Sequence, residues 1–198
     1  MLARENPFAT DRVEKLLRFN PEWSGTSWAK LDKKWNLLGR HATITGRHGS
    51  GKTCFLDAWA ARHTEMTGYQ TLRIFLNHEQ KTMSDLQWND LSQCDGKIII
   101  LDGEEQLNFR ARSKFYKLTK NATGILVTRH SQGRLPTLIH LDPNMAVLST
   151  CVKKLAPAQY KELAPLLPEL WRKHHRNIRH ILLECYDSSA WNGQADKP

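Results

Sequence analysis

The stretch from Gly46 to Thr53 carries the residues of this chain that are best suited to bind a phosphorylated ligand. It fits the pattern G-x-x-x-x-G-K-[ST], in which glycines let successive backbone N–H groups turn toward phosphate oxygens. Lys52 would neutralise charge on the β- and γ-phosphates, and the Thr53 hydroxyl would bind Mg²⁺. The predicted ligand is therefore a nucleoside triphosphate with Mg²⁺. The predicted binding residues are consecutive: Gly46, Arg47, His48, Gly49, Ser50, Gly51, Lys52, Thr53 and Cys54.

The residues on either side of this loop have the order that the pattern requires. His41 to Thr45 is predicted as a short buried strand, and Cys54 to Ala61 as a helix with regularly spaced apolar residues. The helix would direct its positive dipole end at the phosphates. The alternative is a flexible glycine turn that merely joins a strand to a helix.

A second element of such a site is predicted at Ile98 to Asp102, where four aliphatic residues run into an acid. In a parallel sheet covered on both faces, a strand is continuously aliphatic, and an Asp at its carboxyl end lies beside the phosphates. Asp102 is therefore predicted to hold Mg²⁺, directly or through water. The alternative is an ordinary core strand that ends in a turn at Asp102-Gly103.

From residue 41 to 141 the pattern alternates between strand and helix. The further elements predicted there are strands at 71–76, 124–128 and 137–141, a helix at 84–91 capped by Ser84, and a helix along the apolar stripe Leu107, Ala111, Phe115 and Leu118. Five strands joined by crossover helices predict an α/β fold, with helices on both faces of a parallel five-stranded sheet.

Outside this core, which would bind the nucleotide, the pattern is helical. Asp142-Pro143 is predicted to cap a helix over Met145 to Leu155, and Asn177 to cap a last helix over Ile178 to Tyr186. Near the start of the chain, Arg12 to Phe19 is predicted as a helix that packs on the sheet. The predicted parts are an N-terminal helical extension at 1–40, the core at 41–141, a helical lid at 142–188 and a loose tail at 189–198.

The cysteines and the hydropathy pattern bear on the compartment. Cys54, Cys94, Cys151 and Cys185 are widely spaced, which predicts reduced, mostly buried thiols of a cytoplasmic protein. Met1 to Asp11 is mixed polar, so no targeting segment is expected. No apolar run approaches the roughly 18 residues that span a bilayer, so no membrane association is expected either.

Together, Gly46 to Thr53, the Asp102 strand, the polar end of the fourth strand and the helices that follow resemble the additional-strand (ASCE) P-loop ATPases. The resemblance is nearest to the AAA+ proteins and their NACHT-like relatives, and it covers roughly residues 41 to 187. It implies a sheet order of 5-1-4-3-2, ATP as the ligand, and hydrolysis coupled to motion of the helical lid.

The resemblance also implies roles for individual residues. Thr128 resembles the sensor that orients the attacking water, and Arg179 the second sensor, which contacts the γ-phosphate. Arg134 resembles an arginine finger that reaches a neighbouring subunit, with Arg129 as its competitor. For each arginine the alternative is a solvated surface charge. A finger implies a homo-oligomer, but the lid is shorter than is typical of AAA+ proteins, which leaves ring assembly open.

The position after Asp102 departs from the AAA+ pattern. The usual glutamate is replaced by Gly103, which is followed by Glu104 and Glu105. A water nucleophile needs a carboxylate within about 3 Å as base or orienter. NACHT-like relatives also have glycine at this position and place an acid three residues beyond the Asp, which favours Glu105 over Glu104. If neither carboxylate reaches the water, the protein is a slow switch or a pure nucleotide binder.

Positive charge is concentrated in one part of the chain. The net charge is +9, and residues 106–141 hold seven basic residues and no acidic one. On the predicted helix, Arg110, Lys114 and Lys117 share a face that could bind a nucleic-acid backbone or an acidic protein, within a basic region at 106–134. The alternative is a solvated face. The basic run at 172–176 has the same two interpretations.

Three functions fit these observations. The favoured one is an ATP-binding regulatory or switch ATPase. The second is a nucleic-acid-binding module with a degenerate nucleotide site. The third is a small-molecule P-loop kinase, which needs a second substrate pocket under a basic lid.

Overall fold

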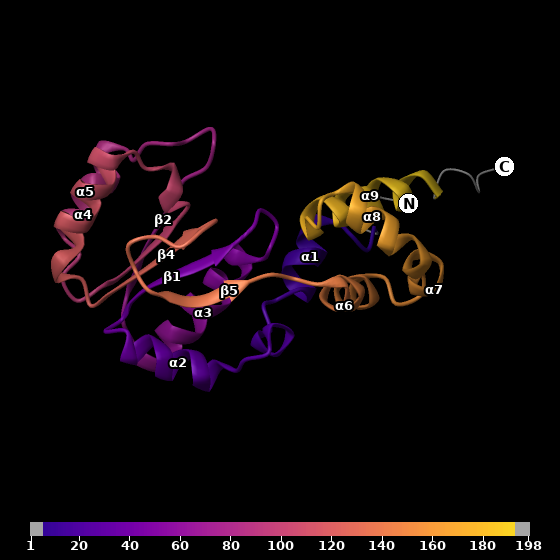
Figure 1. The fold of residues 1–198 in the computed structure, drawn as a ribbon, viewed down its shortest axis with the longest axis horizontal. Helices are drawn as coiled ribbons and strands as arrows, with labels where there is room; N and C mark the ends of the chain where they lie inside the picture. Colours follow the sequence, from indigo (N-terminus) through magenta and orange to yellow (C-terminus); the bar gives the residue numbers. More distant parts are fainter. Residues whose placement is uncertain (1–5, 193–198) are drawn as a thin grey trace. The chain divides into compact units, whose positions relative to one another are not determined.

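A five-stranded parallel sheet forms the centre of the part between residues 25 and 141 in the computed structural model, which describes residues 6–192 (Figure 1). Its strands are β1 (His41–Gly46), β2 (Thr71–Phe75), β3 (Ile98–Asp102), β4 (Gly124–Arg129) and β5 (Thr137–Leu141). They lie in the order β2-β3-β4-β1-β5, and every neighbouring pair is parallel. This is the predicted 5-1-4-3-2 order, so the predicted fold class is confirmed.

Helices cover both faces of this sheet (Figure 1). The helical segments of this part are α2 (Trp28–Leu37), α3 (Lys52–Thr67), α4 (Asp85–Ser92), η3 (Glu104–Gln106), α5 (Phe109–Leu118) and η4 (Thr119–Asn121). On one face, Leu91 of α4 and Phe115 of α5 pack in one cluster with Leu101 and Val127 of the strands. On the other, the Trp35 ring of α2 lies edge-on, 5.0 Å from the Trp59 ring of α3. The predicted cap of α4, Ser84, is confirmed.

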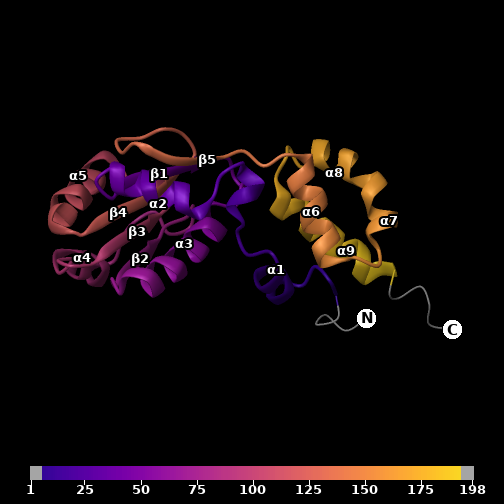
Figure 2. The ribbon, with the colours of Figure 1, turned by 90° about the horizontal axis from the view of Figure 1, so that it is seen from below.

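The remaining helices form a separate core. They are α1 (Thr10–Leu16), η2 (Pro21–Ser24), α6 (Met145–Leu155), α7 (Tyr160–Leu163), η5 (Ala164–Leu166), α8 (Leu167–Lys173) and α9 (Ile178–Asn192). Figure 2 shows α6 beside α8 and α9, and the buried side chains at their centre include Leu148, Leu167 and Ile181. The expected change to helices after residue 141 is therefore confirmed.

Some local expectations about the helices are wrong. The N-terminal helix does not pack on the sheet, because Val13 and Leu17 pack in the helical core, while α2, which the sequence did not predict, packs beside the sheet. The cap of α6 is Asn144 and not Asp142, since the Asn144 side chain accepts a hydrogen bond from the Val147 N–H at 3.1 Å. The predicted loose tail is helical as far as Asn192, and its remainder, 193–198, lies outside the described residues.

The described residues fall into two compact units. The sheet unit comprises Gly25–Arg47 and Gly51–Leu141, and the helical unit comprises the other described residues, His48–Ser50 among them. All four cysteines are thiols, and three of them are buried. Within residues 6–192, every helix is too short or too polar to span a bilayer.

Candidate nucleotide-binding site

The loop between β1 and α3 has the backbone conformation that its glycines allow. Gly49 and Gly51 have φ angles of 70° and 90°, in the left-handed region that side chains disfavour. Gly51 is the N-cap of α3, which therefore begins at Lys52 and leaves its first N–H groups free of helical partners. The predicted loop thus leads directly into the positive end of a helix of 16 residues.

Lys52 folds back over this loop. Its Nζ donates hydrogen bonds to the Gly46 carbonyl at 2.7 Å and to the Arg47 carbonyl at 2.8 Å. Burial lowers the pKa of the Lys52 ammonium, and the nearby carboxylates of Glu105 and Asp102 partly oppose that shift. A polyphosphate would give this half-buried cation a stronger acceptor than two neutral carbonyls.

Asp102 lies at the carboxyl end of β3 with both carboxylate oxygens held. The Thr53 hydroxyl donates to Oδ2 at 2.9 Å, and the Thr128 hydroxyl donates to Oδ1 at 2.6 Å. The Gly103 N–H in turn donates to the Thr128 hydroxyl oxygen at 2.8 Å. The structure therefore brings together three residues that sequence reasoning selected from α3, β3 and β4.

The donor atoms of Thr53 and Asp102 suit a magnesium ion. Mg²⁺ prefers oxygen ligands and is commonly bound by one or two protein side chains together with substrate phosphates and water. One hydroxyl and one carboxylate at hydrogen-bond distance match that pattern. Among the described residues, no group of three or more His, Cys, Asp or Glu could hold a metal ion by itself. A magnesium ion here would therefore take most of its ligands from phosphate and water.

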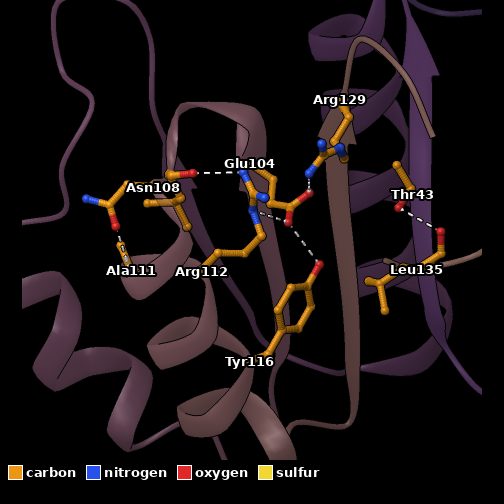
Figure 3. Close-up of polar contacts among 9 residues, drawn as sticks. Thr43, Glu104, Asn108, Ala111, Arg112, Tyr116, Arg129 and Leu135 are labelled. Carbon is orange, nitrogen blue, oxygen red and sulfur yellow. Dashed lines mark hydrogen bonds and ion pairs between the residues drawn. The ribbon is translucent and has the colours of Figure 1, made fainter. Parts of the chain in front are cut away.

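Glu104 is enclosed by partners from its own chain (Figure 3). Its side chain is fully buried, and Oε2 lies 2.6 Å from Nη1 of Arg129. Its Oε1 lies 3.1 Å from Nε of Arg112 and accepts a hydrogen bond from the Tyr116 hydroxyl at 3.2 Å. Burial, together with the Glu104 charge, raises the pKa of Tyr116 well above its usual value. Glu104 could act as a base only after these contacts were broken.

Glu105, the favoured base, is held differently. Its Oε1 lies 3.2 Å from Nε2 of His130, a contact that no sequence pattern predicted. Its Oε2 is buried and has no hydrogen-bond partner among the residues that the structure describes. An unpaired buried carboxylate oxygen is costly in free energy, so this atom is suited to accept a hydrogen bond from a bound water or ligand.

The predicted arginines occupy three different settings. Arg129 pairs with Glu104, and its side chain is only 15% exposed, so reaching another subunit would require breaking a buried ion pair. The guanidinium of Arg134 lies over the Tyr116 ring, 4.7 Å from its centroid, on an exposed residue. Arg179 is an exposed residue of α9 in the helical unit. The roles of Arg134 and Arg179 remain predictions.

A basic surface on α5 is defined here by Arg110, Lys114 and Lys117, all three of which are exposed. Nζ of Lys114 lies 4.3 Å from the ring centroid of Trp88 in α4. Phe109, the first residue of α5, is 83% exposed. The aromatic rings of Trp88 and Phe109 therefore accompany this surface.

Comparisons with known proteins agree with this fold. The chain is similar to one in a structure of Drosophila ORC bound to DNA, with a TM-score of 0.63 and 17% identity, over 99% of this chain and 61% of that one. It is also similar to the Aeropyrum pernix ORC1 protein in complex with DNA, with a TM-score of 0.62 and 14% identity, over 96% of this chain and 64% of that one. No protein-family model and no curated protein sequence matches the chain.

The chain thus spans a little over three fifths of the length of these two solved chains. At such identities the likeness establishes the fold alone, a five-stranded parallel sheet of order β2-β3-β4-β1-β5 with its helices. The NACHT-like part of the resemblance finds no support in these comparisons.

Proposed function

We propose that this protein binds ATP and hydrolyses it slowly, as a regulatory or switch ATPase. The observation that carries the proposal is the hydrogen-bonded set Thr53–Asp102–Thr128, which lies at the carboxyl edge of the sheet, where the glycine loop enters α3. Ligands of parallel α/β sheets bind at this edge.

Each residue of the site would have a separate role in binding or hydrolysing ATP. Backbone N–H groups of the loop and Lys52 would hold the phosphates, and Thr128, fixed by Asp102, would orient the attacking water. The free Oε2 of Glu105 would accept a hydrogen bond from that water. Magnesium, held by Thr53 and Asp102, would neutralise phosphate charge.

Slow hydrolysis follows from the position of the base. Glu105 lies in the 3₁₀ turn η3, two residues beyond the position where the AAA+ pattern has its acid, and His130 already contacts its other oxygen. Residues 142–188 would act as a lid, in which Arg179 contacts the γ-phosphate, and Arg134 would act as a finger within a homo-oligomer. ATP binding would then change the conformation of the lid, and hydrolysis would release it.

Phosphate release and thermal unfolding of the purified protein test this proposal. MgATP should raise the melting temperature of the wild type, and Lys52→Ala should abolish that shift, whereas Lys33→Ala, on an exposed part of α2, should keep it. Glu105→Gln should bind ATP but release phosphate at least about tenfold more slowly. The control Glu65→Gln, at an exposed residue of α3, should behave as the wild type. If no nucleotide shifts the wild type at millimolar concentration, the proposal is wrong.

Nucleic-acid binding is a second candidate function, favoured by the exposed α5 surface and its neighbouring rings. The two solved structures reported above contain DNA. Labelled DNA or RNA, followed by fluorescence anisotropy at several salt concentrations, tests it. Replacing Arg110, Lys114 and Lys117 together by alanine should weaken binding and lower the salt slope by about two to three.

The matched control for that triple variant replaces three exposed lysines elsewhere, Lys30, Lys33 and Lys81, and removes the same charge. Equal losses in both triple variants would show that only net charge matters. No binding by the wild type at low salt would exclude this function. A small-molecule kinase would instead need an acceptor, so phosphate release to water alone argues against it.

A further inference from the structure

Arg73 reaches the predicted magnesium site from β2. Its backbone pairs with Ile100 of β3, two residues before Asp102. Nη2 of its guanidinium lies 3.6 Å from Oδ2 of Asp102, and Nη1 forms an ion pair with Asp57 of α3. The side chain is 34% exposed and that of Asp57 57% exposed, whereas that of Asp102 is only 6% exposed. One arginine therefore lies between a buried carboxylate and an exposed one.

The contacted oxygen is the one that faces the metal donors. Oδ2 of Asp102 accepts the Thr53 hydrogen bond, so a magnesium ion bound by Thr53 and Asp102 would lie on the side of the carboxylate that Arg73 approaches. A guanidinium beside that oxygen stabilises its negative charge, and it repels a second cation at the same atom. Nothing in the loop pattern or in the aliphatic strand assigns such a role to an arginine of β2.

We propose that Arg73 is a positioning residue that competes with magnesium for Asp102, and that Asp57 is the alternative partner that draws Arg73 away. With Arg73 on Asp102, the carboxylate is neutralised and held by its own chain. Arg73 contacts both carboxylates in this structure, and with Arg73 on Asp57 alone, Oδ2 would be open to a divalent cation. Asp57 is exposed and lies on α3, the helix that follows the glycine loop. Arg73 can therefore change partners without unfolding of α3 or β2. This inference rests on the proposed binding of MgATP.

The test compares the affinity for the fluorescent analogue mant-ATP in EDTA with that in saturating Mg²⁺. The dissociation constant in EDTA divided by that in Mg²⁺ gives a ratio that measures how strongly magnesium and nucleotide assist each other's binding. In Arg73→Gln the ratio should rise about threefold or more, because binding in Mg²⁺ tightens while binding in EDTA changes by less than about twofold. Arg73→Lys, which keeps a positive charge, should lie close to the wild type.

Asp57→Asn should change the ratio of dissociation constants in the opposite direction. Without the exposed carboxylate, Asp102 is the remaining ion-pair partner of Arg73 among the residues that the structure describes, so the ratio should fall below that of the wild type. A purely structural role for Arg73 would lower the melting temperature of Arg73→Gln in the absence of nucleotide and leave the ratio unchanged.

Three results would overturn the inference. One is an unchanged ratio in both Arg73→Gln and Asp57→Asn. Another is a ratio that rises in Arg73→Gln only because binding in EDTA weakens, since Arg73 would then contact phosphate. The third is a ratio that moves in the same direction in both variants. If the wild type binds no mant-ATP at all, the proposed function itself fails, which is a distinct outcome.

Discussion

Gly103 lies directly against the backbone of Leu76. A Cβ at position 103 would lie 2.3 Å from the Leu76 carbonyl oxygen, and Gly103 has a φ angle of 94°, which other residues avoid. The position directly after Asp102 is where AAA+ proteins usually have their acid, and here the backbone excludes any side chain. The base proposed for hydrolysis therefore lies at another position, Glu105, whose Oε2 has no hydrogen-bond partner among the residues that the structure describes.

Substitutions at Gly103 and Gly96 distinguish the energetic cost of this close contact from that of backbone strain. Gly96 also has a left-handed backbone, with a φ of 73°, but a Cβ there would meet nothing within 4 Å. Gly96→Ala should lower the free energy of unfolding by about 1 kcal/mol, and Gly103→Ala by at least about 2 kcal/mol, as measured by urea unfolding. Gly103→Glu should be destabilised similarly and should not hydrolyse ATP faster. A stable, faster Gly103→Glu would contradict the assignment of the base.

The two glutamates that follow Gly103 should differ sharply in their effect on stability. Glu104→Ala leaves two arginines beside a buried site without their counter-charge, which should cost about 3–5 kcal/mol of unfolding free energy. Glu105→Ala removes one contact to His130 and one unpaired oxygen, so its cost should stay below about 1 kcal/mol. Urea unfolding measures both. Similar losses in the two variants would mean that Glu104 is not held as described.

The parts of the site that sequence reasoning found depend on local patterns. The glycine loop, the aliphatic run into Asp102 and Thr128 at the end of β4 can each be recognised within a few residues, and parallel pairing then brings their ends to one edge. The contacts of Arg73 and His130 depend on which side chains face each other across different elements, which a single sequence does not reveal. Helix α2 was missed because turn-forming residues precede it, although Trp28, Leu31 and Trp35 have helical spacing.

The depressed pKa of Lys52 has a consequence for nucleotide binding. Burial lowers the pKa of this ammonium below its usual value of 10.5, so it loses its charge at a lower pH than an exposed lysine does. Since only the charged form attracts phosphate, ATP affinity should fall as the pH rises through that lowered pKa. Binding of mant-ATP between pH 7 and 10 measures this.

Lys52→Arg is the control for that experiment, because a guanidinium stays charged throughout this range. If it retains any affinity, its binding should be flat where that of the wild type declines. Parallel declines in both proteins would assign the pH dependence to another group.

Replacement of Thr128 should change both the free energy of unfolding and the rate of phosphate release. Its hydroxyl donates to Asp102 and accepts the buried Gly103 N–H, so Thr128→Val leaves a backbone donor and a carboxylate oxygen without partners. The free energy of unfolding should fall by about 1–3 kcal/mol. Thr128→Ser keeps the hydroxyl and should lose less than half as much unfolding free energy.

If Thr128 also orients the attacking water, the valine variant should release phosphate at least about tenfold more slowly at saturating ATP, while the serine variant stays near the wild type. Equal phosphate release by the two variants, once both are shown to be folded and saturated with ATP, would confine Thr128 to a structural role.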